Sequence, residues 1–180
     1  YPIKGFHYLL EAFAQVLKTY PQATLSVPGK NYLQVNALHR NSYQKYLAKL
    51  TRQYGLEDKI EFLGSLDAEG MRRAYLEANV FVLPSTIENS PNSLGEAMLL
   101  GLPCVAADVG GVSTMMKHDT EGFLYQGTAP YMLAHYIREV FAMEAEAENM
   151  GFAAKHHAQR THDPEENCNR LLEIYSEIAL

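Results

Sequence analysis

The chain has 180 residues, of which 47% are hydrophobic and 20% are charged, and this ordinary globular composition predicts a single domain with one sizeable core. A formal net charge of −6 argues against binding to a nucleic acid polymer, because such a surface needs clustered Lys and Arg. No apolar run reaches the ~18 residues of a membrane span, so we expect a cytoplasmic protein that contacts a membrane only peripherally, if at all.

Helical and strand patterns alternate along the first half of the chain. Apolar residues recur at helical spacing after Gly5, and Pro21 ends that helix. The stretch 32–41 carries little pattern, whereas Asp67 is placed to cap a helix whose apolar face includes Tyr75. The predicted elements are a helix over 6–17, a strand over 23–27, a helix from 42 to near 55, a strand over 60–63 and a helix over 68–78.

The second half continues this alternation. Residues 80–83 and 103–107 are short and apolar, as buried parallel strands are, and Gly101 lies where the helix between them should end. The remaining elements are a strand over 122–125, helices over 129–142 and 144–157, and a last helix from Asp163-Pro164 with Leu171, Leu172, Tyr175 and Ile178 on one face. The alternation predicts an α/β fold with a Rossmann-like, doubly wound parallel sheet and helices on both faces.

The loop between strand 80–83 and its helix is the best candidate for a ligand site. Glu88 and Glu96 lie eight positions apart, on either side of Asn89-Ser90-Pro91-Asn92-Ser93. In an open α/β sheet this loop opens into a crevice, and the next helix points its unpaired N–H groups into it. We therefore expect N–H groups near Ser93 and Leu94 to hold phosphate, and each carboxylate to accept hydrogen bonds from sugar hydroxyls.

A purely structural interpretation of Glu96 is also available. Ser93-x-x-Glu96 fits a capping box, in which the Ser side chain accepts one helix N–H and the Glu side chain another. This box does not account for Glu88, nor for the polar residues between the two acids, so a ligand site is favoured. The two interpretations do not exclude each other.

Three short motifs together resemble a known family. Glu88, seven intervening residues and Glu96 are followed by Ala97-Met98, while Lys4-Gly5 lies near the start and Gly110-Gly111 follows the second strand. This pattern resembles the C-terminal donor-binding domain of the retaining GT-B glycosyltransferases of group 1 (GT4-like). The resemblance implies that residues 1–180 form one half of a GT-B fold. A first strand, a nearby Arg and the N-terminal acceptor domain would then lie upstream.

The resemblance also implies a role for each matching residue. Lys4 and Glu88 would be catalytic, with Lys4 at the diphosphate and Glu88 at the hydroxyls of the donor sugar. Glu96 would bind ribose, and the remaining donor-binding residues would be Gly29, Leu66, Asn89, Ser90, Asn92, Ser93 and Leu94. Gly29 could equally be only a turn glycine, and Leu66 marks a loop whose main chain would hold the nucleobase. Ser113 and Thr114 depart from the family, which usually has Pro and Glu there.

We therefore expect the donor-binding domain of an enzyme that transfers sugar from a nucleotide-diphosphate sugar to a sugar or lipid-linked acceptor. No metal and no cofactor are expected, and the isolated domain should be inactive because the acceptor groups lie in the other domain. A nucleotide-sugar 2-epimerase-like isomerase and a binding-only module remain alternatives, the latter supported by Ser113 and Thr114.

The sequence lacks the motifs of zinc sites, nucleophilic hydrolases, P-loop proteins and dinucleotide-binding folds. The sequence has no HExxH, no paired Cys/His pattern, no GxSxG, no Walker A motif and no GxGxxG. Cys104 lies in an apolar strand and is expected to be a buried, unreactive thiol, which fits a reducing compartment. His156 and His157 are expected at the surface.

Overall fold

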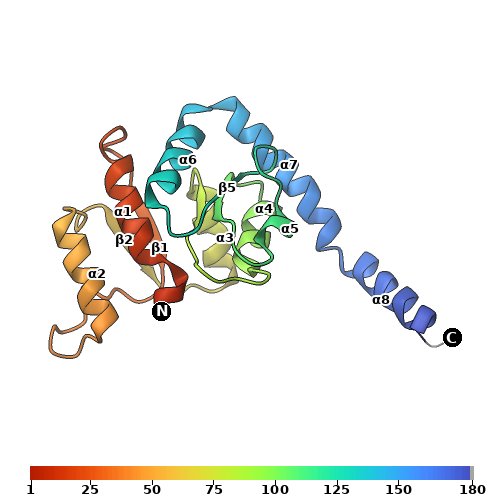
Figure 1. Ribbon diagram of the computed structural model, residues 1–180, viewed down its shortest axis with the longest axis horizontal. Helices are drawn as coiled ribbons and strands as arrows, with labels where there is room; N and C mark the ends of the chain where they lie inside the picture. The colour runs from red at the N-terminus through yellow and green to blue at the C-terminus, as the bar shows by residue number, and fades with distance from the viewer. Residues whose placement is uncertain (179–180) are drawn as a thin grey trace.

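Parallel strands and covering helices follow one another along the chain in the computed structural model, which describes residues 1–178 (Figure 1). The predicted Rossmann-like α/β fold is confirmed. The elements are η1 (Pro2–Lys4), α1 (Phe6–Val16), β1 (Leu25–Pro28), α2 (Ser42–Gln53), β2 (Ile60–Gly64), α3 (Ala68–Glu77), β3 (Phe81–Leu83), α4 (Asn92–Leu99), β4 (Cys104–Ala107), α5 (Val112–Met115), β5 (Phe123–Tyr125), α6 (Pro130–Ala142), α7 (Ala145–Thr161) and α8 (Pro164–Ile178).

The strands pair in parallel but form two hydrogen-bonded sheets in place of one continuous sheet. β1 pairs with β2, and β3, β4 and β5 pair in that order. Parallel neighbours need crossover connections, and helices supply most of these here. Within residues 1–178 no strand bridges β1 and β3, so each of them keeps one unpaired edge.

The fully buried strand β4 separates two apolar clusters. Val105 and Ala107 belong to a cluster with Leu10 of α1 and Leu133 of α6. Cys104 and Ala106, on the opposite face of β4, belong to a second cluster with side chains of α4 and α7. Successive residues of a strand point to opposite faces, so this split places helices on both sides of the sheet. Burial also raises the pKa of the Cys104 thiol, as expected of an unreactive side chain.

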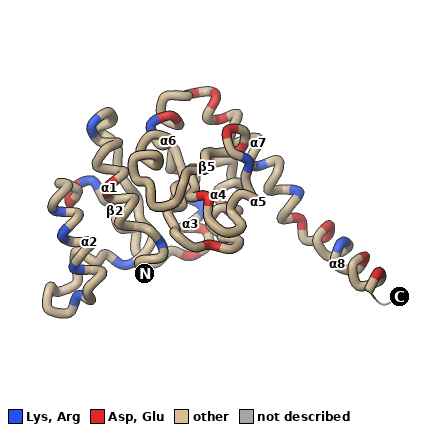
Figure 2. Tube along the Cα trace, viewed as in Figure 1, with Lys and Arg blue, Asp and Glu red and all other residues tan. Residues whose placement is uncertain are grey.

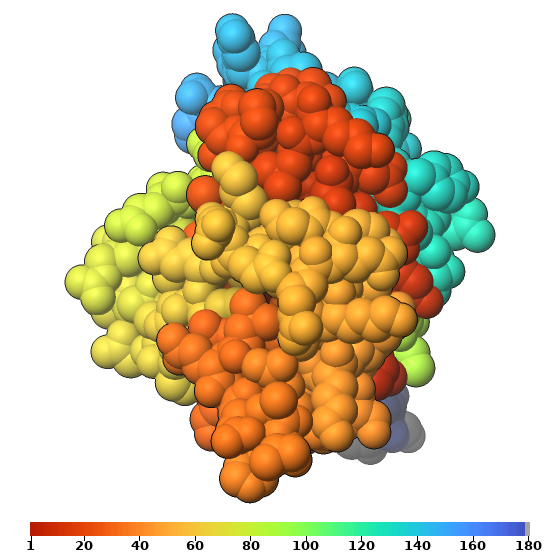
Figure 3. Space-filling view, turned by 90° about the vertical axis from the view of Figure 1, so that its left-hand side faces the viewer, coloured from red at the N-terminus to blue at the C-terminus, as the bar shows by residue number. Residues whose placement is uncertain are grey.

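The stretch 32–41, which carried little pattern, is anchored to α2. Tyr32 is buried, and its hydroxyl lies 2.7 Å from Oγ1 of Thr51. The side chain of Arg40 donates to the carbonyl of Leu33. Figure 3 shows this segment spread with α1 and α2 over one face of the molecule. A single buried aromatic residue thus fixes a segment that has no regular structure of its own.

Helix α8 projects away from the rest of the chain (Figure 1). Its predicted apolar face is exposed along its length, which excludes packing of that face on the domain's own sheet. In α7 the acidic residues lie in the first turns and the basic residues in the second half, whereas α8 is mostly acidic (Figure 2). Among the helices of residues 1–178, none is both long and apolar enough to cross a membrane.

Helix α7 extends to Thr161, four residues beyond its predicted end at 157. Its residue His157 was predicted to be exposed, and this prediction is wrong. Nδ1 of His157 lies 2.7 Å from a carboxylate oxygen of the buried Glu121, which also accepts the N–H of Lys117. The pair joins α7 to the turn that precedes β5.

Candidate functional site

The loop from β3 to α4 lies at the carboxyl edge of its sheet, where a ligand site was predicted. β3 ends at Leu83, and Pro91 is the N-cap of α4. Ser85, two residues after the end of the strand, is 1% exposed, whereas Asn89 and Ser90 are exposed. The loop is therefore anchored at its start and open to solvent in its middle.

The N-terminal residues lie against this loop. The carbonyl of Ile3 accepts hydrogen bonds from the N–H of Thr86 at 2.8 Å and from its hydroxyl at 3.2 Å. Gly5 has a φ of 65°, and a Cβ built on it would lie 1.7 Å from the carbonyl oxygen of Pro84. Only glycine permits this approach, and the result is that Lys4 is held beside the loop.

Lys4 and Glu88, the two residues predicted to be catalytic, form an ion pair. Lys4 Nζ lies 2.5 Å from Glu88 Oε1, and the two side chains are 57% and 11% exposed. A largely exposed lysine gives little net stabilisation to such a pair, about 0–1 kcal/mol. The pair can therefore open at small cost when an anion competes for the ammonium group.

Gly110 and Gly111 press against the same loop from its other side. A Cβ on Gly110 would lie 1.8 Å from the carbonyl oxygen of Glu88, and one on Gly111 would lie 2.2 Å from that of Asn89. Ser113 and Thr114, which depart from the family pattern, leave the contact between the two glycines and the loop intact. The hydroxyl of Thr114 donates a hydrogen bond to the carbonyl of Gly111 at 2.7 Å. The glycine pair thus fixes the backbone on which Glu88 stands.

The N-terminus of α4 has no side-chain cap, so the capping-box interpretation of Ser93 and Glu96 is wrong. The helix begins at Asn92, which places Ser93 inside its first turn instead of at the cap. The N–H of Leu94 already donates to the carbonyl of Pro91 at 3.0 Å. Within residues 1–178 the N–H groups of Asn92 and Ser93 have no acceptor. These two groups can hold an anion.

Tyr75 of α3 is a site residue that the sequence did not predict, and it orients Glu96 through its hydroxyl group. Its hydroxyl donates to Oε2 of Glu96 at 3.1 Å and lies 3.3 Å from the carbonyl oxygen of Ser93. Burial of the ring, and then the charge of Glu96, raise the pKa of Tyr75, so the hydroxyl stays protonated as a donor. The helical spacing correctly assigned the ring to the apolar face, but no sequence signal indicates the partner of its hydroxyl.

Gly29 and Leu66 lie at the ends of β1 and β2, apart from the other predicted residues. The N–H of Gly29 donates to the carbonyl of Gly64 at 2.7 Å, and its φ of 123° favours glycine. Leu66 is half-buried in the turn before α3. In the described part of the chain no hydrogen bond joins either residue to Lys4 or Glu88. They form a second edge of the same site or a separate structural turn.

Metal ligands are not gathered at any point of residues 1–178, since no three His, Cys, Asp or Glu side chains come together there. The polar groups of the site are a lysine, two carboxylates and backbone N–H groups. This set can bind an anion together with hydroxyl-bearing rings.

Gly110→Ala tests how tightly the backbone of Gly110 packs against the carbonyl group of Glu88. The added methyl group meets the carbonyl of Glu88 and also imposes strain at a φ of 56°. Gly55→Ala is the matched control, because Gly55 has a φ of 63° but no atom within 4 Å of its built Cβ. Urea unfolding should show a loss of about 1–2 kcal/mol for the control and about 1–3 kcal/mol more for Gly110→Ala. Equal losses would mean that the loop can move aside.

Several known proteins are similar to this chain in sequence and structure. D-inositol 3-phosphate glycosyltransferase of Streptomyces avermitilis is 31% identical over 160 residues, which cover 88% of this chain and 34% of that protein. Anabaena Alr3699/HepE in complex with UDP superposes with a TM-score of 0.85 at 26% identity, over 98% of this chain and 46% of that one. Sucrose-phosphate synthase from Thermosynechococcus elongatus gives a TM-score of 0.83 at 26% identity, over 99% and 43%.

The chain spans between 34% and 46% of the length of these three proteins. The family model described as "Glycosyl transferases group 1" matches residues 1–157, which include every predicted site residue. The chain therefore belongs to the group 1 family of glycosyltransferases.

Proposed function

We propose that this chain is the donor-binding domain of a retaining glycosyltransferase that uses a nucleotide-diphosphate sugar. The observation that carries the proposal is the convergence of Lys4, Glu88 and the uncapped N-terminus of α4 at one loop. The solved relative Alr3699/HepE has been crystallised with UDP and with UDP-glucose, which supports the same ligand class here.

The diphosphate would bind between the start of α4 and Lys4. The unpaired N–H groups of Asn92 and Ser93 point from the positive end of the helix dipole. Lys4 would leave Glu88 for the phosphate oxygens, and this exchange costs little because the lysine is largely exposed. Glu88, released from Lys4 in this way, is the residue that we expect to bind the hydroxyls of the donor sugar.

Glu88 and Glu96 would then each bind one sugar ring of the donor. Glu88, freed from Lys4, would accept hydrogen bonds from hydroxyls of the donor sugar, with Asn89 and Ser90 beside it. Glu96, oriented by Tyr75, would accept from the ribose hydroxyls. The base would extend toward the loops of Gly29 and Leu66.

The chemistry in this proposal is leaving-group stabilisation without a metal. When the bond from the anomeric carbon to the diphosphate oxygen breaks, its electron pair stays on that oxygen. Lys4 and the helix N–H groups would offset the new charge, and preorganised donors of this kind are worth several kcal/mol in enzymes. The new bond forms to an acceptor hydroxyl oxygen, and the proton of that hydroxyl would pass to the departing diphosphate oxygen. Because the acceptor would be held by chain outside residues 1–180, we expect this domain to bind donor without transferring sugar.

Calorimetric titration with UDP, GDP and ADP tests the proposal and also identifies the base. At least one of these nucleotides should bind. Failure of all three at millimolar concentration would reject the proposal. Product analysis of a longer polypeptide that contains this domain would separate transfer from epimerisation.

Lys4→Met should weaken binding of the preferred nucleoside diphosphate by about tenfold or more, because a charge-assisted hydrogen bond to phosphate is lost. Lys18→Met, at an exposed position after α1, is the control and should bind as the parent chain does. Titration calorimetry measures both, and unchanged affinity in Lys4→Met would contradict the assigned role.

Glu88→Gln provides the opposite comparison for the same ion pair. It removes a negative charge beside the diphosphate and frees Lys4, so the nucleoside diphosphate should bind as well as before or more tightly. The additional affinity for the sugar-bearing nucleotide should fall, because a neutral amide is a weaker acceptor for sugar hydroxyls. Equal losses for the two ligands would show that Glu88 is only structural.

Tyr75→Phe tests the orientation of Glu96. The variant keeps the buried ring but loses the hydrogen bond, so affinity for the nucleoside diphosphate should fall by about threefold to tenfold. Affinity for its 2′,3′-dideoxy analogue should not change, since that ligand offers no hydroxyl to Glu96. A parallel loss for both ligands would indicate a general distortion and contradict a positioning role.

A further inference from the structure

Positive charge is concentrated in one segment of this acidic chain. Residues 30–56 contain five Lys or Arg residues and no Asp or Glu. These five cations are Lys30, Arg40, Lys45, Lys49 and Arg52. Figure 2 shows Lys and Arg around α2, at one end of the molecule, where acidic residues are scarce. The surface around α2 is therefore basic although the chain as a whole is acidic.

Three of these cations form a stripe along α2. Lys45, Lys49 and Arg52 are spaced by four and then three residues, so their side chains project from the same face of the helix. All three residues are exposed. Within residues 1–178 none of the three side chains has a carboxylate at ion-pair distance. This cationic stripe covers about 10 Å along the helix axis, and its charge is available to an anionic partner.

The opposite face of α2 fixes the direction of the cationic stripe. The buried residues of the helix are Leu47, Ala48, Leu50 and Thr51. The hydroxyl of Thr51 also lies 2.7 Å from that of Tyr32. Rotation of the helix would expose these side chains to water and lose the free energy of their burial. The backbone that carries the three cations is therefore held with the stripe outward.

Two further exposed side chains flank the cationic stripe. Tyr46, the neighbour of Lys45, is 46% exposed, and Leu38 in the preceding segment is 86% exposed. The Oδ1 atom of Asn36 accepts the N–H of Leu38 at 3.0 Å, which holds Leu38 in a turn. This segment and α2 lie on the same face of the molecule (Figure 3). Fixed cations thus lie beside an aliphatic side chain and an amphipathic ring.

We propose that this surface, made of Lys45, Lys49, Arg52, Tyr46 and Leu38, binds the headgroup layer of an anionic lipid bilayer. Each Lys or Arg close to such a layer strengthens binding by about fivefold. An apolar side chain beside the cations can enter the boundary between headgroups and acyl chains. The proposal does not depend on the proposed function.

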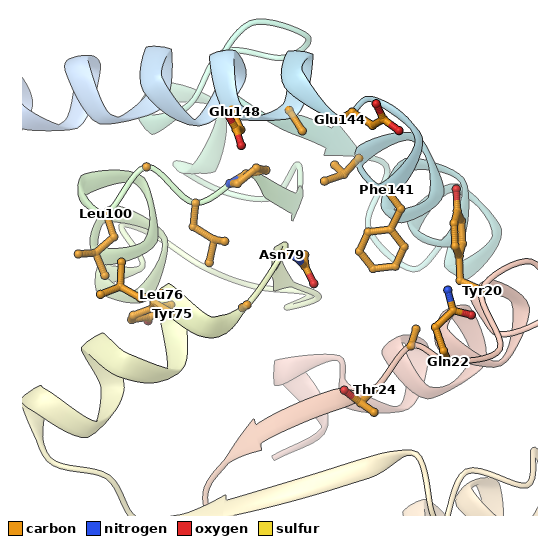
Figure 4. A pocket seen from close by; sticks show the side chains of 17 residues that line it. Tyr20, Gln22, Thr24, Tyr75, Leu76, Asn79, Leu100, Phe141, Glu144 and Glu148 are labelled. Carbon is orange, nitrogen blue, oxygen red and sulfur yellow. The ribbon is translucent and has the colours of Figure 1, made fainter.

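The acidic residues of the chain do not oppose this contact. Residues 144–178 hold eight Asp or Glu and three Lys or Arg, and they form the end of the molecule opposite α2 (Figure 1). Glu144 and Glu148 line a cavity of about 680 Å³ to which no residue of the cationic stripe contributes (Figure 4). At physiological ionic strength, charges more than about 8 Å from the lipid are largely screened. The stripe therefore dominates the interaction when α2 faces the bilayer.

A bilayer fits this surface better than a single-stranded nucleic acid. Proteins that bind such strands combine cations with aromatic rings on which successive bases stack. Here the side chains that flank the stripe are the ring of Tyr46 and the aliphatic chain of Leu38. Leucine offers no stacking surface to a base, but it gains free energy when it leaves water for an apolar layer.

Co-sedimentation of the full 180-residue chain with extruded vesicles tests the proposal. One set of vesicles contains phosphatidylcholine with about 30% phosphatidylglycerol, and the other contains phosphatidylcholine alone. The chain should bind the anionic vesicles at about 50 mM NaCl, and binding should fall at least tenfold at about 500 mM, where screening is strong. Absence of binding at the lower salt, or equal binding to both kinds of vesicle, would overturn the proposal.

The triple variant Lys45→Gln, Lys49→Gln and Arg52→Gln removes the cationic stripe. Gln is a comparable helix former, so α2 should persist, and far-ultraviolet circular dichroism checks this. The partition coefficient on the anionic vesicles should fall by about a hundredfold, because three surface cations are lost.

A second triple variant, Lys18→Gln, Arg73→Gln and Arg160→Gln, is the matched control. It removes the same charge from three exposed positions outside the proposed surface. Its partition coefficient should fall by about fivefold or less. Equal losses in the two triple variants would overturn the proposal, since net charge alone would then explain the binding.

Leu38→Ser tests the apolar part of the surface, with Ala37→Ser at the exposed neighbouring position as its control. Leu38→Ser should weaken binding to the anionic vesicles by about fivefold to tenfold, and Ala37→Ser should change it little. Equal effects would overturn the assignment of Leu38 to the lipid contact. A uridine oligonucleotide is titrated in parallel. Binding of that RNA through the cationic stripe at concentrations where vesicles are not bound would overturn the proposal in favour of a nucleic acid surface.

Discussion

The candidate site depends on the close approach of backbone to backbone at three glycines. Gly5 lies against the carbonyl of Pro84, Gly110 against that of Glu88, and Gly111 against that of Asn89. A methyl group at any of these positions would lie within 2.2 Å of a carbonyl oxygen, and main chain cannot yield as a flexible side chain does. The loop between β3 and α4 is thereby held from two sides, which gives the side chain of Glu88 a fixed base.

The electrostatics of the site divide into two parts with different ligands. The N–H groups at the start of α4 and the ammonium of Lys4 suit negative charge, whereas the carboxylates of Glu88 and Glu96 suit hydroxyl donors. Each acid has a hydrogen-bond donor within the chain, Lys4 for Glu88 and Tyr75 for Glu96. The two donors differ in mobility: Lys4 is largely exposed, whereas the ring of Tyr75 is 7% exposed. We infer that ligand binding changes the first pair and preserves the second.

Local patterns predicted most of the fold, since helical and strand periodicity reflect short-range geometry. Asp67 caps α3 as predicted. The capping box of Asn41 and Gln44 at α2 was not predicted. The expected box at Ser93 and Glu96 failed because the helix starts at Asn92 and has Pro91 as its N-cap, two residues too early for Ser93 to be the cap. Sequence spacing alone does not fix a helix start to within one residue.

Contacts between residues far apart in the chain could not be predicted from the sequence. The partner of the Tyr75 hydroxyl is 21 residues away, and the carboxylate that holds His157 is 36 residues away. The division of the strands into two sheets also depends on pairing between distant segments. For the site, the resemblance assigned roles to Lys4 and Glu88, and the structure adds that their side chains form an ion pair. Which N–H groups of α4 have no acceptor depends on the geometry of its first turn.

We propose that the first turn of α4 receives the diphosphate of the donor. The most direct measurement is a titration of the ¹⁵N-labelled chain with UDP, GDP and ADP, followed by NMR of the backbone amides. With the nucleotide that binds, we expect saturable shifts of the Asn92 and Ser93 amides, while amides of α7 such as Gly151 stay unchanged. Saturable shifts confined to other parts of the chain, or no shift at millimolar concentration of all three nucleotides, would contradict it.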